Sequence, residues 1–432
     1  MSAVTDASTS PATTPEGASA RDGLLQGIRV LDLSTMIAAP LTASALADYG
    51  ADVVKVENPA TGDHLRHFGA QKDDQGLYWK ALARGKRSVA LDLRRPHVQE
   101  LVRRWIGTFD VVVENFRPGT LEHWNLAPAD LLSANPRLVV LRVTAYGQEG
   151  PYRERAGFGT LAEAMTGLAS VSGYADRPPL LPAYPLADIM AGQLGCSAVL
   201  AALHARGRTG RGDIIDLAIY EAALKLLEVN VLEYDQLGQE HTRAGNTYRA
   251  AAPRGSYLCQ DGEWVALSGS TQSVAVRLLR AIGGDDLVED PRFITNVERT
   301  RNVRELDEII GAWCAERPRD EAIDVLTAAG CAVGPLETVA TMLENPQVVA
   351  RGSIATVEDP DLGPLRMTNV YPTFTTHPCP VPAPGPAAIG AGTESILAAD
   401  LGLDEQTVRG VLNGDPPAAG GSTTHGAHFD DA

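Results

Sequence analysis

Short β-type runs alternate with amphipathic stretches in the first third of the chain, and this alternation constrains the fold more than any other feature. IRVLDL is followed by the helix-like LTASALADYG and then by ADVVKVE, and DVVVEN and RLVVLRVTAYG come later. Strands separated by helical segments are typical of βαβ units. The sequence therefore predicts an α/β fold built on a parallel sheet.

The pattern changes near Gly245, which indicates a second, smaller domain. RGSYLCQDGEWVALSG predicts a hairpin around Asp261-Gly262, and helical segments then continue to about Arg317. Before the change, LADIMAGQLGCSAVLAALHARGRTGRG predicts a long helix that ends at glycine and basic residues. A chain of 432 residues, 44% apolar, is long enough for two domains.

Both ends of the chain differ in composition from the rest. Residues 1–22 are mainly Ser, Thr, Ala, Pro and Gly, and residues 415–432 (DPPAAGGSTTHGAHFDDA) are similar. Such segments bury too little apolar surface to offset the entropy of ordering. We predict two disordered tails.

Composition and charge narrow the classes of function. The chain has no run of about 20 uncharged apolar residues and no apolar core near its start, so we expect a cytoplasmic protein without a membrane partner. Its net charge of −17 argues against nucleic acid as a partner. The five cysteines are scattered and form no CxxC, and the histidines form no HExxH pair, so we expect neither a disulfide framework nor a metal site.

The first predicted strand–helix–strand segment, residues 27–57, is similar in length to a dinucleotide-binding unit. Glu57 stands where an acidic ribose ligand would. However, its turn reads Ala38-Ala39-Pro40 and lacks the GxGxxG glycines that let a pyrophosphate approach the helix. The sequence therefore argues against NAD binding.

The same segment resembles the start of CoA-transferase family III, the CaiB/BaiF family that contains formyl-CoA transferase and carnitine CoA-transferase. Six further segments resemble the family in the same order and at about the same spacing, and they cover most of residues 26–413. They are RGKRSVALDL at 84–93, DVVVENFRPGTLE at 110–122, AYGQEGPYRERAGF at 145–158, PLADIMAG at 185–192, RTGRGDIIDLAIYEA at 208–222 and GPLETVATMLENPQV at 334–348.

This resemblance implies a specific architecture. A Rossmann-like large domain would comprise residues 23–205 and 318–414, with a linker at 206–244 and a smaller α+β domain at 245–317. It also implies a homodimer whose subunits interlock like the rings of a chain.

The family's chemistry agrees with the position of Asp188. This residue follows Pro185 at the start of the predicted long helix, where the helix macrodipole favours an ionised carboxylate. Position alone would favour a helix cap, since Asp is a preferred N-cap residue. The match of PLADIMAG to the family's catalytic-aspartate segment implies instead that Asp188 attacks an acyl-CoA and forms mixed-anhydride and aspartyl-CoA thioester intermediates. The substrates would be an acyl-CoA and a carboxylic acid, with no permanently bound cofactor.

An acidic protein that binds the phosphates of CoA needs a local basic cluster, which Lys86, Arg87, Arg94, Arg95 and Arg117 could supply. The resemblance adds further contacts. It implies that Ile37 and Ala38 line the pantetheine channel, and it assigns the rest of the CoA site to Leu91, Asp92, Leu93, Arg94, Asn115, Phe116, Arg117 and His123.

Three positions depart from the family pattern. His123 stands where the family often has an arginine, and Gly159 stands in GFGTLAE where some members have a carboxylate or amide. The segment NTYRAAAPRGSY also lacks the glycine run that closes over the intermediate in formyl-CoA transferase.

Two alternatives remain at this point. An α-methylacyl-CoA racemase shares the fold but needs two opposed acid–base groups, one of them a histidine in a GHDxNY-like loop, and this chain has GFGTLAE there. A non-catalytic acyl-CoA-binding protein would keep the CoA contacts without needing Asp188.

Overall fold

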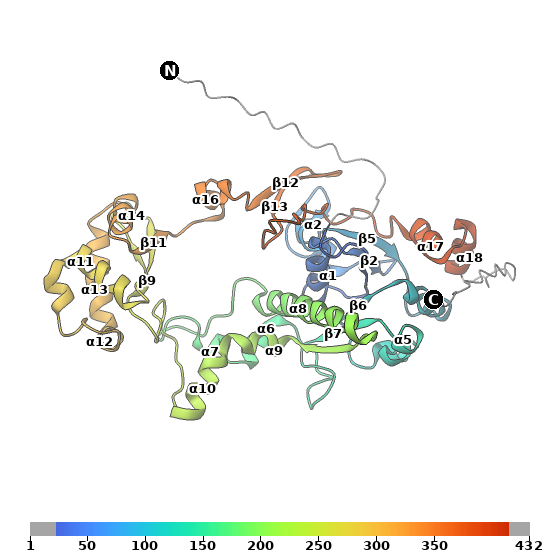
Figure 1. Cartoon of the computed structure of the whole chain (residues 1–432), viewed down its shortest axis with the longest axis horizontal. Coiled ribbons are helices and arrows are strands. Elements are labelled where there is room, and N and C mark those ends of the chain that lie inside the picture. Colours follow the sequence, from blue (N-terminus) through green and yellow to red (C-terminus); the bar gives the residue numbers. More distant parts are fainter. Residues whose placement is uncertain (1–22, 414–432) are drawn as a thin grey trace, which may run out of the picture. The chain divides into compact units, whose positions relative to one another are not determined.

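The computed structural model describes residues 23–413 and has a mixed α/β architecture (Figure 1). The two predicted tails, 1–22 and 415–432, lie outside the described residues. The chain divides into two compact units. Of the described residues, the first contains 23–159, Ala187–Ala222 and 355–413, and the second contains Thr160–Leu186 and Ala223–Ile354. The predicted small domain at 245–317 lies within the second unit.

A six-stranded sheet forms the centre of the first unit. Every neighbouring pair in it is parallel, in the order β5-β2-β1-β6-β7-β8. The strands are β1 (Arg29–Asp32), β2 (Asp52–Glu57), β5 (Lys86–Ala90), β6 (Val111–Glu114), β7 (Val139–Thr144) and β8 (Ile214–Ala218). This confirms the predicted parallel sheet. The strand order reverses between β1 and β6, and ligands of such sheets bind beside the carboxyl ends of the strands at that point.

The central strands are nearly continuous runs of valine and leucine because both faces of a parallel sheet are covered. All four residues of β6 are buried, and β1 pairs Val30 with Val53 of β2 and Val111 of β6. On one side, α3 (Pro96–Trp105) contacts α17 (Thr393–Leu401) and α18 (Glu405–Asn413). Val98, Leu101, Val102 and Trp105 of α3 recur at the spacing of one helix face and join the main core.

Two further helices, α1 (Ala38–Asp48) and α8 (Leu186–Thr209), pack on the central sheet. Helix α1 contacts β1, β2, β6 and β7, and α8 packs on α1. Two glycines make the approach of α8 close: a Cβ at Gly192 would lie 2.7 Å from Cβ of Leu41, and one at Gly195 would lie 3.0 Å from Cδ2 of Leu141. The hydroxyl of Thr42 also donates to the carbonyl of Gly192 at 2.9 Å.

By length and composition alone, α8 is the one described helix that could cross a membrane. One face of it packs on α1 and β7 through Gly192 and Gly195, and 33% of its apolar window is buried. This agrees with the predicted long helix and with its predicted basic end, since Arg206 and Arg208 lie in the last turn.

The second unit contains a three-stranded sheet in the order β11-β10-β9. Its strands are β9 (Arg254–Leu258), β10 (Trp264–Ser268) and β11 (Ala332–Pro335), which pair antiparallel. The turn between β9 and β10 contains Gly262 with φ of 83°, so the predicted hairpin at Asp261-Gly262 is confirmed. Its helices include α11 (Gln272–Glu289), α12 (Asn296–Arg301), α13 (Val303–Ala315) and α14 (Arg319–Ala328). They enclose a separate core.

Shorter elements complete the chain. Between β2 and β7 these are η1 (His64–His67), β3 (Gln71–Lys72), β4 (Gln75–Gly76), α2 (Leu77–Leu82), η2 (Ile106–Thr108), α4 (Thr120–His123) and α5 (Pro128–Ala134). Between β7 and β9 they are α6 (Gly159–Met165), α7 (Leu168–Val171), α9 (Ile219–Leu224), η3 (Lys225–Leu227) and α10 (Glu228–Leu237). After β11 come α15 (Val339–Met342), α16 (Pro346–Ala350), β12 (Ile354–Asp359) and β13 (Gly363–Thr368).

Candidate active site

A pocket of about 200 Å³ lies at the carboxyl edge of the central sheet. Its lining follows the ends of β1, β2, β5 and β6. The lining residues are Leu33, Thr35, Val56, Glu57, Asn58, Thr61, Gly62, Asp63, His64, Leu91, Asp92, Leu93, Arg94, Phe116 and Trp124. The pocket therefore lies where the strand order reverses, the usual ligand position in such folds.

Five of the CoA contacts implied by the sequence lie together in this pocket: Leu91, Asp92, Leu93, Arg94 and Phe116. The position of Phe116 is set from two sides. Its main-chain N–H donates to the buried carboxylate of Glu114 at 2.8 Å, and its ring packs edge-on against Trp124 with 4.9 Å between centroids.

The pocket also contains polar residues that the sequence analysis did not identify: Thr35, Asn58, Thr61 and His64. Each follows the carboxyl end of β1 or β2 along the chain. Position after a parallel strand was therefore the signal that could have identified them.

The β1–α1 loop forms one wall of the pocket and is held by side chains from elsewhere. Asn115 accepts from the N–H of Thr35 at 2.8 Å and donates to the carbonyl of Thr35 at 2.7 Å. Met36 has φ of 68°, in the left-handed region, and its N–H donates to Asp63 at 3.1 Å. Ile37 and Ala38 come next and are both buried, outside the lining of this pocket.

A buried group of charged side chains lies beneath this loop. Lys86 Nζ is 2.8 Å from Asp32 Oδ2, and Lys55 Nζ is 3.1 Å from Asp63 Oδ2. Burial alone would raise the pKa of Asp32, but the ammonium groups of Lys55 and Lys86 hold that pKa below its ordinary value. Lys86 therefore neutralises a buried carboxylate. The prediction that Lys86 belongs to a basic cluster for the CoA phosphates is wrong, because its side chain is buried and paired with Asp32.

The other predicted cations are more exposed. Arg94 lines the pocket and donates to both carboxylate oxygens of Asp92, at 2.7 and 3.0 Å, and these bonds lower the pKa of Asp92. Arg95 approaches the same carboxylate at 3.5 Å, whereas Arg87 pairs with Asp52 at 2.6 Å. Arg117 and His123 are exposed and do not line the pocket.

Asp188 is the third residue of α8, inside the first turn, and is half-buried. This position differs from that of an N-cap, which precedes the first turn. A Cβ at Gly159, the first residue of α6, would lie 2.8 Å from Cγ and 3.2 Å from Oδ1 of Asp188. Gly157 in turn lies against Tyr146, which follows β7. Asp188 therefore lies near the carboxyl edge of the same sheet that carries the pocket.

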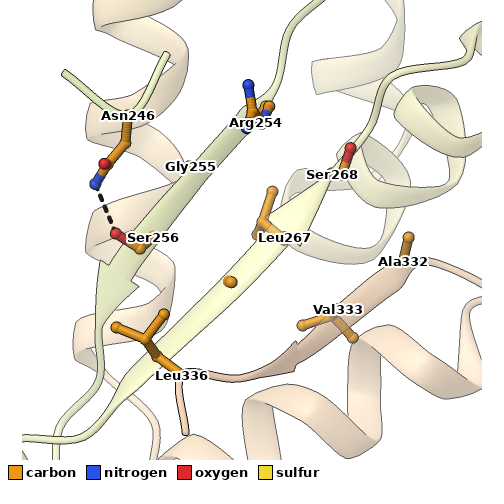
Figure 2. A pocket seen from close by; sticks show the side chains of 10 residues that line it. Asn246, Arg254, Gly255, Ser256, Leu267, Ser268, Ala332, Val333 and Leu336 are labelled. Carbon is orange, nitrogen blue, oxygen red and sulfur yellow. Dashed lines mark hydrogen bonds between the residues drawn. The ribbon is translucent and has the colours of Figure 1, made fainter. Parts of the chain in front are cut away.

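A second pocket, of about 420 Å³, lies on the three-stranded sheet of the second unit (Figure 2). Asn246, Arg254, Gly255 and Ser256, from the segment that lacks the glycine run, contribute to its lining, and Asn246 donates to Ser256 at 2.7 Å. Arg254 is the one ionisable group among its lining residues, so this pocket offers contacts but no acid–base pair. Among residues 23–413, the His, Cys, Asp and Glu side chains form no group of three that could hold a metal ion.

Comparisons with known proteins agree with the architecture and the residue pattern. The profile of CoA-transferase family III matches residues 25–393. Succinyl-CoA–D-citramalate CoA-transferase of Chloroflexus aurantiacus is 40% identical over 382 residues, which cover 88% of this chain and 95% of that protein. Succinyl-CoA:glutarate CoA-transferase of Mus musculus is 29% identical over 389 residues, covering 90% and 89%.

Solved structures show the same similarity. A CAIB/BAIF family protein from Brucella suis superposes with a TM-score of 0.77 at 30% identity, over 88% of this chain and all of that chain. An aspartate-to-alanine mutant of Rv3272 from Mycobacterium tuberculosis has a TM-score of 0.78 at 29% identity, over 88% and 99%. With its parallel sheet, its pocket at the strand ends and these matches, the chain belongs to CoA-transferase family III.

Proposed function

We propose that this enzyme transfers CoA from succinyl-CoA to a short dicarboxylic acid, with Asp188 as the nucleophile. The substrates are inferred from relatives, since proteins 40% identical to this chain are named for succinyl-CoA with D-citramalate or L-malate. The observation that carries the role of Asp188 is its place in the first turn of α8 at the carboxyl edge of the sheet. The start of a helix favours negative charge, and a carboxylate nucleophile has to be ionised.

Four displacements complete the proposed reaction. A carboxylate oxygen of Asp188 attacks the thioester carbon of succinyl-CoA, and the C–S bond breaks to give a mixed anhydride and CoA thiolate. The thiolate attacks the aspartyl carbonyl and releases succinate, which leaves an aspartyl-CoA thioester. The acceptor carboxylate then displaces CoA, and the thiolate finally attacks the acceptor's acyl carbon. Asp188 is regenerated, no net proton is exchanged, and the energy of the thioester is kept.

The pocket beside β1, β2, β5 and β6 would hold part of the CoA molecule. Its volume of about 200 Å³ is below the roughly 300 Å³ at which pockets usually enclose a drug-sized ligand. One end of CoA would therefore fill the pocket and the rest would lie along the surface. Phe116 and Trp124 offer aromatic surface for the adenine, and Arg94 offers a cation for a phosphate.

A homodimer is part of the proposal, and its support comes from α10. This helix buries none of its residues, and Val229, Val231, Leu232, Tyr234 and Leu237 are all more than half exposed. An exposed apolar helix of this kind is typical of a protein–protein interface. We propose a second copy of the chain as its partner.

A cytoplasmic location is also proposed. All five cysteines are free, three of them buried, as is common in a reducing compartment.

The alternative, a racemase, requires two acid–base groups on opposite faces of the substrate. Here the residue against Asp188 is Gly159, which has no ionisable group. Gly159 therefore supplies no acid–base group beside Asp188, and the GFGTLAE loop lacks the histidine that a racemase uses there.

A substrate panel tests the proposal. The purified protein is incubated with succinyl-CoA or acetyl-CoA and, separately, with citramalate, malate, glutarate or a monocarboxylate, and the CoA esters are identified by mass spectrometry. We expect transfer from succinyl-CoA to a dicarboxylate. Transfer only to monocarboxylates would overturn the substrate proposal, and epimerisation of a 2-methylacyl-CoA without transfer would identify a racemase.

A further inference from the structure

The contact between Gly159 and Asp188 is closer than any side chain at position 159 would allow. The three heavy atoms nearest to a Cβ placed at Gly159 all belong to the Asp188 carboxyl group: Oδ2 is the nearest, then Cγ at 2.8 Å and Oδ1 at 3.2 Å. Atoms of a real side chain do not approach a Cβ below about 3.0 Å, because close-packed atoms repel steeply at such distances. An alanine at position 159 would therefore displace the carboxyl group.

The backbone of Gly159 does not itself require glycine. Gly159 is absent from the glycines with positive φ, and it is the first residue of α6, where alanine would be the better helix former. Glycine is therefore needed at position 159 because it leaves space for the side chain of Asp188.

Helix α8 cannot easily move away to relieve such a collision. One turn after Asp188, Gly192 lies against Leu41 and the carbonyl of Ala38 in α1, and Thr42 donates to the carbonyl of Gly192. The α8 backbone is thus fixed on α1. A methyl group at position 159 would instead rotate the Asp188 side chain.

We propose that Gly159 is a positioning residue that fixes the direction in which the Asp188 carboxylate is presented to the thioester. This inference rests on the proposed role of Asp188 as nucleophile. Attack by a carboxylate needs the reacting atoms aligned at about 3–3.5 Å, and a misplacement of about 1 Å can cost roughly 10²-fold in rate. Neither Gly159 nor Asp188 is among the residues that line the pocket that we assign to CoA.

Gly159→Ala tests the proposal by a split in kinetic constants. We expect kcat to fall about 100-fold while the KM for succinyl-CoA changes less than about threefold, because the substitution misdirects the nucleophile without touching the CoA pocket. The matched control is Gly207→Ala, a second helical glycine whose Cβ would meet no atom within 4 Å. This control should keep the parent's kcat. A Gly159→Ala enzyme with the parent's kcat would overturn the proposal.

A double-mutant cycle tests the contact itself and does not depend on activity. Gly159→Ala should lower the melting temperature of the parent, and in the Asp188→Ala background it should leave the melting temperature unchanged or raise it, because the colliding carboxyl group is gone. If Gly159→Ala does not fold, the double variant should fold again. An equal loss in both backgrounds would show that Gly159 faces another group and would refute the inference. Full transfer by Asp188→Ala would instead refute the proposed nucleophile, while the coupling in melting temperature would still report the contact.

Discussion

Asn115, at the end of β6, holds Thr35 in the β1–α1 loop by two hydrogen bonds to its main chain. The amide accepts from the Thr35 N–H at 2.8 Å and donates to the Thr35 carbonyl at 2.7 Å. The two residues lie 80 positions apart in the chain, and the bonds join the two strands between which the sheet order reverses. Asn115 therefore shapes the pocket through Thr35, although it does not itself line the pocket.

Asn115→Ala removes both of these bonds and leaves a half-buried N–H and carbonyl without a side-chain partner. We expect a loss of about 1–3 kcal/mol in unfolding free energy and a higher KM for acyl-CoA, because the Thr35 wall loosens. Asn345→Ala serves as control. It removes the cap of α16 in the second unit and should cost about 1 kcal/mol without changing that KM. Urea unfolding and steady-state kinetics measure both effects, and an unchanged KM for Asn115→Ala would contradict the assigned pocket.

Arg94→Glu tests whether the pocket binds the phosphates of CoA. Because Arg94 lines the pocket, reversal of its charge should raise the KM for acyl-CoA, leave kcat nearly unchanged and reduce the salt dependence of binding. Arg117 is exposed outside the lining, so we expect a smaller effect from Arg117→Glu. Arg104→Glu, on the exposed part of α3, makes the same change in net charge and controls for it. Equal KM values for Arg94→Glu and Arg104→Glu would show that the phosphates of CoA do not bind at Arg94.

Lys86→Met tests the buried charge cluster under the loop. Removing one partner of a buried pair should cost about 3–5 kcal/mol, whereas Lys225→Met removes an exposed pair with Glu228 and should cost about 0–1 kcal/mol. The pKa of Asp32 is lowered in the folded protein, so its stabilising contribution is present above the unfolded pKa and is lost as the pH falls through the folded one. Without Lys86 that folded pKa rises, so acid unfolding should begin at a higher pH. Urea titrations between about pH 7 and pH 3 would show this shift. Acid unfolding of Lys86→Met at the same pH as the parent would contradict the pairing of Lys86 with Asp32.

The exposed apolar face of α10 predicts that the chain is not monomeric. Sedimentation velocity should give the mass of a dimer at micromolar and at nanomolar concentrations. Leu232→Glu, which places a charge on that face, should weaken the dimer, whereas Val339→Glu, on a still more exposed residue of α15, should not. A monomer at both concentrations would contradict the proposed assembly.

Local pattern was sufficient to predict the elements that carry the site. The valine-rich runs predicted β2, β6 and β7, and the glycine and arginine residues at the end of α8 predicted where that helix ends. Both signals, the periodicity of apolar residues and the residues that end a helix, act over a few neighbouring residues. Leu91 to Arg94 and Phe116 were identified by family resemblance, and the structure brings them into one pocket.

Contacts between distant segments could not be predicted in this way. The burial of Lys86 depends on Asp32, 54 residues earlier and two strands away in the sheet, and in sequence RGKRS looks like solvated charge. The contact of Gly159 with Asp188 likewise depends on how α8 packs against α1 through Gly192. Such packing has no signature in the neighbouring residues.

Trapping of the covalent intermediate is the most direct test of the central claim. The enzyme is incubated with succinyl-CoA, quenched with hydroxylamine and digested, and the peptide that contains Asp188 is analysed by mass spectrometry. We predict an aspartyl hydroxamate at Asp188 in the parent and in Asp324→Ala, an exposed acidic residue of α14 that serves as control, because hydroxylamine displaces CoA from an aspartyl thioester. Asp188→Ala should give no adduct and no transfer. Transfer by Asp188→Ala, or a hydroxamate on another carboxylate, would contradict the account.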